Sequence, residues 1–206
     1  MRGPQKTNPI RQIAATELPT RWGAFRALGF ERWPGRHSPE TALALVLGDP
    51  SLETPLVRIH SQCITGEVLG SLRCDCGEQL ELAMGAIAAE GRGLLIYEQQ
   101  EGRGIGLMAK LQAYALQDEG LDTIAANHAL GFEADCRDFM LPAAILNHLG
   151  IREIRLLSNN PDKCRALAKA GIGVVEQIPC EAPPGSYSTG YLGTKKHRMG
   201  HTLKLV

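Results

Sequence analysis

The sequence predicts an α/β protein in which a mixed β-sheet is flanked by helices. Short apolar runs at 42–48, 55–61 and 93–99 are typical of strands, and segments with helical spacing follow the second and third runs. Only a short turn separates the first two runs, which favours a sheet that is not purely parallel. Nearer the carboxyl end, 153–178 has the strand–helix–strand order of a βαβ unit.

Two helices are expected between the early strands and the βαβ unit. Apolar side chains in 78–90 recur at the spacing of one helical face, Glu78 favours the helix start, and Gly91 or Gly93 can end it. The second helix follows the glycine-rich segment 101–106. The residues expected on its apolar face are Leu107, Leu111, Tyr114 and Ala115.

The βαβ unit has well-marked boundaries. Its first strand, 153–158, runs into an Asn-Asn pair at 159–160 that can cap a helix, and Pro161 occupies the first helical position. Gly171 ends this helix, and the apolar run at 173–178 is the next strand. These features predict a second strand parallel to the first.

We expect residues 1–206 to form a single domain. A chain of 206 residues suits one substantial α/β domain, and no repeat, low-complexity tract or linker marks a boundary. Residues 1–11 are expected to be a mobile tail, and the segment from about 181 is expected to be irregular.

The composition excludes several classes of protein. The 22 basic and 22 acidic residues give no net charge, which argues against nucleic-acid binding but leaves room for a small polyanionic ligand. No apolar run reaches the roughly 18 residues that span a bilayer, so no membrane partner is expected. The first twelve residues are polar and do not resemble a secretory signal. The cytoplasm is therefore expected, where stable disulfides are uncommon.

Half of the six cysteines lie close together in the sequence. Ten residues separate Cys63 from Cys74, and only Asp75 separates Cys74 from Cys76. In extended backbone Cys74 and Cys76 point to the same side, and Cys63 can reach the same point from the end of a predicted strand. Three thiolates with one open position are typical of catalytic zinc, while a disulfide and a structural zinc knuckle completed by His60 remain alternatives. The cysteines expected to be incidental are Cys136, Cys164 and Cys180.

Two further segments carry polar side chains at short spacing. EGRGIG, 101–106, matches neither a P-loop nor the dinucleotide fingerprint, but its glycines can turn backbone N–H groups towards an anion, and Arg103 adds a guanidinium. Within 127–139, Asp135 and Arg137 are spaced as a general base beside a phosphate clamp. A plain surface loop and a solvated charged turn remain the alternatives.

Six segments together resemble the GTP cyclohydrolase II family. They are, in chain order, VRIHSQCITGEVLGSLRCDCGEQLE, EQQEGRGIGL, AYALQDEGLDT, NHALGFEADCRDF, SNNPDK and YLGTKKHRMGH. The resemblance runs from about Leu18 to His201 and implies the monofunctional form, because the chain has no room for the dihydroxybutanone-phosphate synthase domain fused to some relatives. The family opens the guanine imidazole ring of GTP, releasing formate and pyrophosphate, in the first step of riboflavin biosynthesis.

The resemblance also implies the cofactors, the partners and the site residues. A homodimer is expected to bind GTP, with Mg²⁺ on the triphosphate and one Zn²⁺ per subunit held by three cysteines and a water. By position, the zinc ligands are Cys63, Cys74 and Cys76, and the catalytic residues are Asp135, Arg137 and Tyr114. The GTP-binding residues are Arg58, Ile59, His60, Ser61, Gln62, Gln79, Glu101, Gly102, Arg103, Thr123, Ser158 and Lys163.

Four of these residues have specific expected roles. Asp135 resembles the proton acceptor, and Tyr114 resembles a tyrosine needed for the ring-opening hydrolysis. Arg137 resembles the proposed nucleophile on the α-phosphate. Because a guanidinium with a pKa above about 12 is a poor nucleophile, charge stabilisation is the alternative role for Arg137. Glu101 is the first candidate for the carboxylate that recognises guanine.

Overall fold

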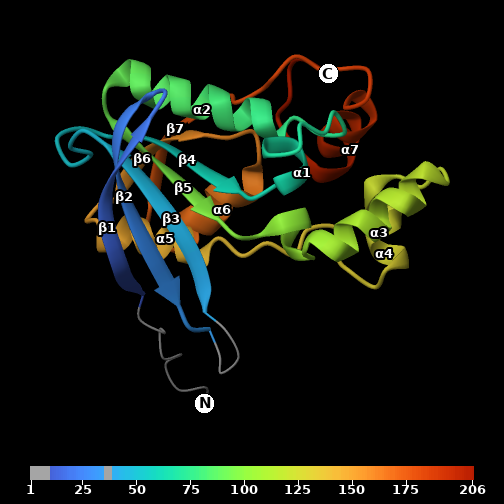
Figure 1. Ribbon diagram of the computed structural model, residues 1–206, viewed down its shortest axis with the longest axis horizontal. Coiled ribbons are helices and arrows are strands. Elements are labelled where there is room, and N and C mark those ends of the chain that lie inside the picture. The colour runs from blue at the N-terminus through green and yellow to red at the C-terminus, as the bar shows by residue number, and fades with distance from the viewer. Residues whose placement is uncertain (1–9, 35–38) are drawn as a thin grey trace.

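The computed structural model describes residues 10–34 and 39–206. Within this part, a seven-stranded sheet has the order β1-β2-β3-β5-β4-β6-β7 (Figure 1). The strands are β1 (Arg11–Thr20), β2 (Gly23–Arg32), β3 (Glu40–Leu47), β4 (Leu56–Ser61), β5 (Gly93–Glu98), β6 (Glu153–Leu157) and β7 (Gly173–Ile178).

Seven α-helices and one 3₁₀ helix accompany the strands in the described ranges. The helices are α1 (Ile64–Glu67), α2 (Cys76–Glu90), η1 (Glu101–Gly104), α3 (Leu107–Asp118), α4 (Thr123–Ala129), α5 (Met140–His148), α6 (Pro161–Lys169) and α7 (Thr189–Met199). Across the described residues, no helix has both the length and the hydropathy needed to cross a membrane.

The sheet is antiparallel on one side and parallel on the other. β1, β2, β3 and β5 pair in antiparallel fashion, whereas β4 is parallel to both β5 and β6, and β6 is parallel to β7. The predicted mixed sheet is therefore confirmed. The predicted βαβ unit is also confirmed, because α6 connects the parallel strands β6 and β7.

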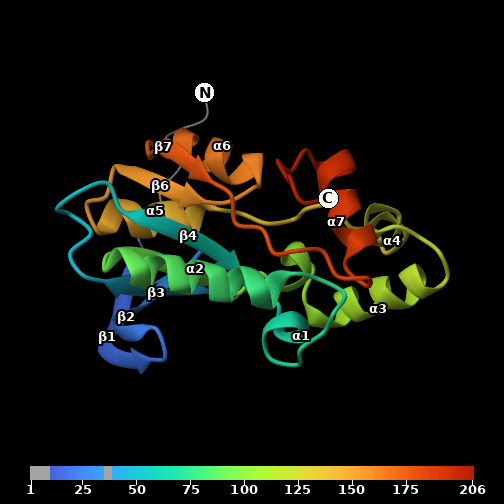
Figure 2. The same ribbon diagram turned by 90° about the horizontal axis from the view of Figure 1, so that it is seen from above.

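Helices cover both faces of the sheet (Figures 1 and 2). Ile87 of α2 belongs to the same buried cluster as Leu95 of β5. Leu146 of α5 belongs to a second cluster, together with Leu94 and Ile96 of β5. Since successive side chains of a strand point to opposite faces, Leu95 packs towards α2 while its two neighbours pack towards α5 and α6. The central strands are consequently buried on both sides.

Most of the predicted elements are present within a few residues of their expected bounds. The runs at 42–48, 55–61 and 93–99 are β3, β4 and β5, and the segment 78–90 lies in α2. α6 begins at Pro161, as predicted, and Asn160 caps it by accepting a hydrogen bond from the backbone of Asp162. The hairpin of β1 and β2 is not among the predicted elements.

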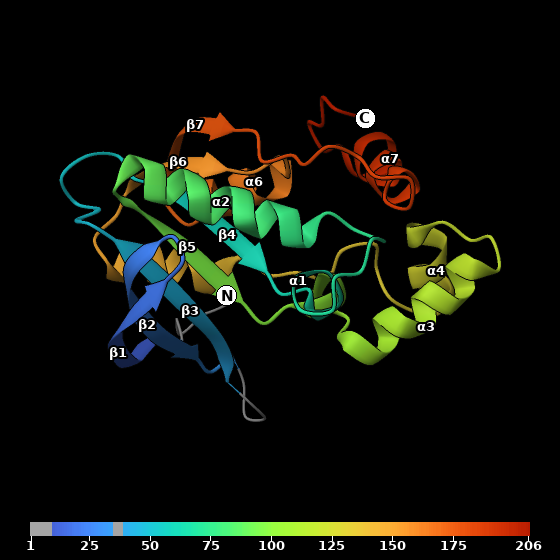
Figure 3. The same cartoon turned by 45° about the horizontal axis from the view of Figure 1, so that its top comes forward.

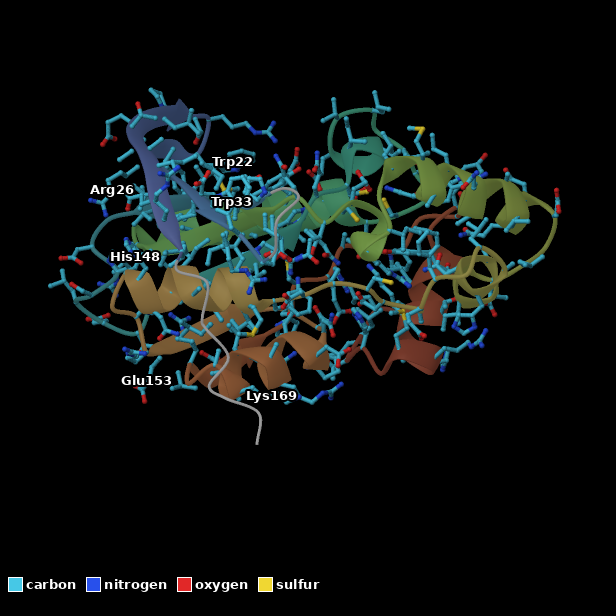
Figure 4. All side chains as sticks on the ribbon, turned by 90° about the horizontal axis from the view of Figure 1, so that it is seen from below. Trp22, Arg26, Trp33, His148, Glu153 and Lys169 are labelled. Carbon is cyan, nitrogen blue, oxygen red and sulfur yellow. The ribbon has the colours of Figure 1, made fainter. Side chains whose placement is uncertain are left out.

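The sequence does not predict the hairpin, because β1 is an edge strand that is exposed along almost its whole length. A strand without a buried face has no alternation of apolar and polar residues to mark it. Its partner β2 is anchored by the buried side chains of Phe25 and Phe30. Figure 4 shows Trp22 and Trp33 beside this hairpin, away from α3 and α4.

The predicted apolar face of α3 is wrong. The buried residues of α3 are Lys110 and Ala113, whereas Leu111 and Ala115 are exposed. α3 lies with α4 and α7 beyond one end of the sheet, and it does not cover a sheet face (Figures 2 and 3). A helix that borders a polar cavity turns polar residues inward, so hydrophobic periodicity misidentifies its buried side.

The expectation of an irregular segment from about 181 is wrong in part, because α7 occupies Thr189–Met199. Two glycines and several polar residues give this stretch a weak helix propensity. The burial of Leu192 and Lys195 against the rest of the protein stabilises the helix instead. The predicted tail, 1–11, lies outside the described residues up to residue 9, and Arg11 begins β1.

The carboxyl ends of β4, β5 and β6 meet at one edge of the sheet, next to α1, η1 and α7 (Figures 1 and 3). β4 lies between β5 and β6, so the chain leaves β4 towards one neighbour and later returns to the other. In open α/β sheets such a switch point forms a crevice where ligands bind. The functional site is therefore expected in the segments that follow these strands.

Gly93 allows β5 to begin beside β4, and its replacement tests this packing. Its φ is +148°, and a Cβ at this position would lie 2.5 Å from the carbonyl oxygen of Leu56. We expect Gly93→Ala to lower the free energy of unfolding by about 1–3 kcal/mol, measured by urea denaturation and followed by tryptophan fluorescence.

Gly85→Ala is the matched control, because Gly85 lies within α2 with open space around its Cβ position. This variant should be more stable than the wild type by about 0.5–1 kcal/mol, since alanine favours a helix interior. Equal stability of Gly93→Ala and the wild type would contradict the packing described for β5.

Candidate metal centre and substrate pocket

The thiols of Cys63, Cys74 and Cys76 form one cluster, with their sulfur atoms within 4.8 Å of one another. Cys63 lies between β4 and α1, and Cys76 is the first residue of α2. Gly66 of α1 makes the close approach possible, because a Cβ there would lie 2.9 Å from the Cys74 sulfur. The cluster predicted from the spacing is therefore present.

The prediction that extended backbone brings Cys74 and Cys76 together is wrong. Cys74 and Cys76 do not point together from an extended strand, since Asp75 is the N-cap of α2 with φ −102° and ψ 17°. The chain turns into the helix at this point, and the backbone N–H of Gln79 donates to the carbonyl of Asp75. The start of α2 holds the two thiols on the same side.

Ionisation of one thiol in this cluster disfavours ionisation of the other two. Hydrogen bonds from Cys74 and Cys76 hold the pKa of Cys63 well below its usual range. The same contacts with Cys63 raise the pKa of both Cys74 and Cys76, because a second thiolate would face the first at short range. A bound divalent cation would remove this repulsion.

The geometry of the sulfur atoms fits a tetrahedral metal ion. Thiolates about 2.3 Å from a tetrahedral zinc lie about 3.8 Å from one another. The Cys63 and Cys74 sulfurs are 3.6 Å apart. The donor set, three soft thiolates, is one that zinc accepts readily. These residues could hold a metal ion, and their arrangement is compatible with zinc.

The alternatives of a disulfide and of a knuckle completed by His60 are not supported. All six cysteines are free. The Nε2 atom of His60 is 2.8 Å from Glu67, whose carboxylate also accepts from the backbone of Cys63 and from the hydroxyl of Tyr97. Burial lowers the pKa of His60 to about 4, so the ring is neutral near pH 7 and its Nε2–H donates to Glu67. His60 therefore braces the Cys63 backbone.

A buried lysine contacts the cluster. The Nζ atom of Lys110 lies 3.1 Å from the Cys63 sulfur and 2.8 Å from both Thr65 Oγ1 and Glu101 Oε1. Burial on its own lowers the pKa of Lys110, but Glu101 and Cys63 raise it above its usual value, so the side chain is charged. This cation offsets part of the negative charge of the thiolates.

One pocket extends from the cysteine cluster to the segments after β4, β5 and β6. It is lined by most of the residues that the sequence predicted for the site. These are Arg58, His60, Ser61, Gln62, Cys63, Cys74, Cys76, Gln79, Glu101, Gly102, Arg103, Tyr114, Thr123, Arg137, Ser158 and Lys163. Ile59 and Asp135 do not line the pocket: the Ile59 carbonyl accepts from Lys163, and Asp135 pairs with Arg137.

The pocket has a strongly cationic region. The Arg58 guanidinium donates to the carbonyl of Leu157 and to Gln79, and the Lys163 ammonium lies 2.7 Å from the Ile59 carbonyl. Burial and the charges of Arg58 and Arg137 hold the pKa of Lys163 well below its usual value. This crowding disfavours the charged form of Lys163, and an anionic ligand such as the predicted phosphate chain would favour it again.

Asp135 and Arg137 form a bidentate pair. The Asp135 carboxylate accepts from Nε of Arg137 at 2.9 Å and from Nη2 at 2.5 Å. Burial on its own raises the pKa of Asp135, but the bonds and charge of Arg137 hold that pKa below its usual range. Burial lowers the pKa of Arg137, and Asp135 more than offsets this change. Both side chains are therefore ionised at neutral pH.

Tyr114 projects from α3 towards the cysteine cluster, with the Arg73 guanidinium 4.8 Å and the Lys110 ammonium 5.6 Å from its ring centroid. Burial raises the pKa of Tyr114 to about 12. The phenol therefore keeps its proton at neutral pH and can act as a proton donor to a ligand in the pocket.

Several lining residues are absent from the predicted set. They are Gln100, Ile105, Lys110, Ala113, Gln117, Asn127, Asn159, Asn160, Cys180, Tyr191, Lys195 and His201. Lys110 is the single charged residue in an otherwise apolar stretch of α3. The sequence alone does not show whether such a lysine is buried or exposed. Tyr191, Lys195 and His201 belong to the segment YLGTKKHRMGH, which resembles the family without indicating a role.

Comparison with known proteins identifies the family. The GTP cyclohydrolase II family profile matches residues 11–179. The chain belongs to this family. The GTP cyclohydrolase-2 of Shigella boydii serotype 18 is 52% identical over 195 residues, which are 94% of this chain and 98% of the relative. The GTP cyclohydrolase-2 of Escherichia coli strain K12 / DH10B has the same identity and coverage. These findings confirm the resemblance seen in the sequence.

Similar solved structures include one two-domain protein. It is RibBX, a two-domain 3,4-dihydroxy-2-butanone 4-phosphate synthase from A. baumannii, with 21% sequence identity and a TM-score of 0.47. The similar region covers 86% of this chain and 41% of RibBX, so this chain spans less than half of that protein.

The buried pair of Lys110 and Glu101 should be essential for stability in this GTP cyclohydrolase II family member. We expect Lys110→Met to lower the free energy of unfolding by about 3–5 kcal/mol, because the variant leaves Glu101 buried without its cation. Urea denaturation measures the change, and the exposed Lys169→Met is the control, with an expected effect below about 0.5 kcal/mol. A loss below about 1 kcal/mol for Lys110→Met would contradict a charged pair at this position.

Proposed function

We propose that this protein is a GTP cyclohydrolase II, the first enzyme of riboflavin biosynthesis. It hydrolyses the guanine imidazole ring of GTP and the anhydride between the α- and β-phosphates. The products are formate, pyrophosphate and 2,5-diamino-6-ribosylamino-4(3H)-pyrimidinone 5′-phosphate. Besides the family, one observation supports this proposal most strongly: a single pocket joins a three-thiol metal cluster to a group of buried cations.

We propose that Cys63, Cys74 and Cys76 hold one Zn²⁺ per subunit, with a water as the fourth ligand. Zinc supplies a Lewis acid that makes water nucleophilic near neutral pH. Mg²⁺ is proposed to bind with the triphosphate and to neutralise part of its charge.

The proposed binding mode places the base near the cysteines and the phosphates near the cations. Arg58, Arg103 and Lys163 are the residues best suited to the phosphates, because all three are basic and line the pocket. The full set proposed to bind GTP is Arg58, Ile59, His60, Ser61, Gln62, Gln79, Glu101, Gly102, Arg103, Thr123, Ser158 and Lys163.

Within that set, the carboxylate of Glu101 is held by several hydrogen bonds. Its carboxylate already accepts from Lys110, from the backbone of Gly102 and from the backbone of Ile64. Each carboxylate oxygen can accept two hydrogen bonds, so Oε2, which accepts only from Ile64, keeps one position for a donor on guanine. Lys110 and the two backbone N–H groups would then fix the orientation of the carboxylate during guanine recognition.

Hydrolysis at guanine C8 requires protons to move as the ring opens and formate leaves. Tyr114, with its raised pKa, is proposed to donate a proton to the ring nitrogen that departs from C8. Asp135 is proposed as the proton acceptor: it is ionised because of its pair with Arg137, and that pair joins it to a residue that lines the pocket. The two groups thus start in the protonation states that their roles require.

Arg137 is proposed to stabilise charge on the α-phosphate, and not to attack it. Its raised pKa keeps the guanidinium protonated, and a protonated guanidinium has no electron pair available for phosphorus. Its bidentate bond to Asp135 fixes the orientation of the charge at the pocket wall. Water is then the attacking group at the anhydride.

We also propose that the protein acts as a single-domain homodimer in the cytoplasm. The exposed side chains of Val68, Leu69 and Leu72 give the connection between α1 and α2 an apolar surface suited to a subunit contact. A reducing compartment suits the reduced thiols that the metal requires.

Product analysis tests the proposed function. With GTP, Mg²⁺ and Zn²⁺, the wild-type protein should release one formate and one pyrophosphate for each GTP consumed. Cys74→Ser should lower formate release about 100-fold or more, since Lewis-acid assistance is worth several kcal/mol. Cys136→Ser, which removes an exposed thiol outside the cluster, is the control and should retain activity.

Two outcomes would contradict the proposal. A formamide product without free formate would indicate an enzyme that stops after ring opening. Full activity in Cys74→Ser, with a zinc content well below that of the wild type, would show that the reaction does not need the metal.

The role of Arg137 is tested with GTP labelled at the α-phosphate. Acid-quenched reactions should contain no label bound to the protein, because the charged guanidinium does not form a bond to phosphorus. Arg137→Lys should retain part of the activity, since it keeps a positive charge and loses the bidentate geometry. Label that maps to Arg137 by mass spectrometry would establish the nucleophile instead.

A further inference from the structure

α7 forms a wall of the pocket, although it lies outside the residues matched by the family profile. Tyr191 and Lys195 of this helix line the pocket, and His201 lines it just beyond the helix. Figure 3 shows α7 beside α4, at the end of the molecule that carries the site. A substrate bound in the pocket would therefore contact this helix.

Arg103 is the residue that α7 most directly affects. It is the one non-glycine residue with a positive φ, 61°, among residues 10–34 and 39–206. Both terminal nitrogens of its guanidinium are buried without a hydrogen-bond partner in this described part of the chain. Strained backbone and buried unpaired donors are costly, and both are typical of a residue that meets a ligand.

The ring of Tyr191 holds this guanidinium. The central carbon of the Arg103 guanidinium is 5.3 Å from the ring centroid, within the range of a cation–π interaction. With no hydrogen bonds at either Nη atom, this contact is the observed restraint on the end of the side chain. The four N–H donors of the two Nη atoms are then available for a phosphate group.

α7 is itself tied to the metal centre. The ammonium of Lys195 lies 2.8 Å from Oδ1 of Asp75, the residue between two of the clustered cysteines, and 4.3 Å from the ring centroid of Tyr191. Lys195 and Asp75 are both buried. Their ion pair fixes one end of the chain of contacts that runs from Asp75 through Lys195 and Tyr191 to Arg103.

We propose that Tyr191 is a positioning residue for the phosphate chain of the substrate. Its ring holds Arg103 with the guanidinium directed to phosphate, while the pair of Lys195 and Asp75 sets the position of α7 relative to the metal centre. The distance between the reacting base and the phosphate-binding end of the pocket is thereby fixed. The assignment rests on the proposed function for the identity of the substrate.

Ligand binding to purified, zinc-loaded protein tests this role. Calorimetry with inorganic tripolyphosphate and, separately, guanosine distinguishes the phosphate end of the site from the base end. We expect Tyr191→Leu to weaken tripolyphosphate binding and to raise KM for GTP about 3- to 30-fold, the range of a cation–π contact, with guanosine binding unchanged. Tyr191→Phe keeps the ring and should remain within about 2-fold of the wild type.

The control is Tyr187→Leu, which removes an exposed tyrosine from the same segment and should change neither ligand. A double-mutant cycle separates positioning from direct contact: in an Arg103→Ala background, Tyr191→Leu should cause no further loss. If Tyr191→Leu does not fold, as judged by circular dichroism, Tyr191→Gln replaces it with the same expectations.

Three results would overturn the inference. They are unchanged tripolyphosphate binding in Tyr191→Leu, equal loss of tripolyphosphate and guanosine, and additive losses in the double mutant. None of these depends on turnover, so a wild-type protein that binds tripolyphosphate but releases no formate would contradict the proposed function alone.

Discussion

The sulfur atoms of Cys63, Cys74 and Cys76, held close together, determine the charge and arrangement of the rest of the site. Three sulfurs at this separation repel one another once they are ionised, so the cluster requires a cation. Two lysines lie around it as well, Lys110 in contact with the Cys63 sulfur and Lys195 paired with Asp75. The surroundings thus offset part of the charge that three thiolates bring to a divalent metal.

The fold brings this cluster to the phosphate-binding residues through the parallel part of the sheet. β4 leads to Cys63, β5 leads to Glu101 and Arg103, and β6 leads to Ser158, so three separate segments meet at one edge. Strands buried on both faces hold these segments with little freedom to move apart. A pocket for a ligand with a base at one end and phosphates at the other follows from the order of the strands.

The sequence predicted the central sheet and the βαβ unit because the strands are strongly apolar. Most of the site residues that it predicted line the pocket, because the motifs are specific in combination. It failed where tertiary contacts override local pattern. β1 has no buried face, α3 buries Lys110 instead of Leu111, and α7 forms despite weak propensity. The contact between Tyr191 and Arg103 joins residues far apart in the chain, which spacing cannot reveal.

X-ray absorption at the zinc edge of the purified protein measures whether the three clustered cysteines bind zinc. We expect one zinc per chain with three sulfur ligands at about 2.3 Å and a single oxygen or nitrogen ligand. Four sulfur ligands would indicate a closed structural site, and a protein that folds and acts on GTP without metal would contradict the role given to the cysteine cluster.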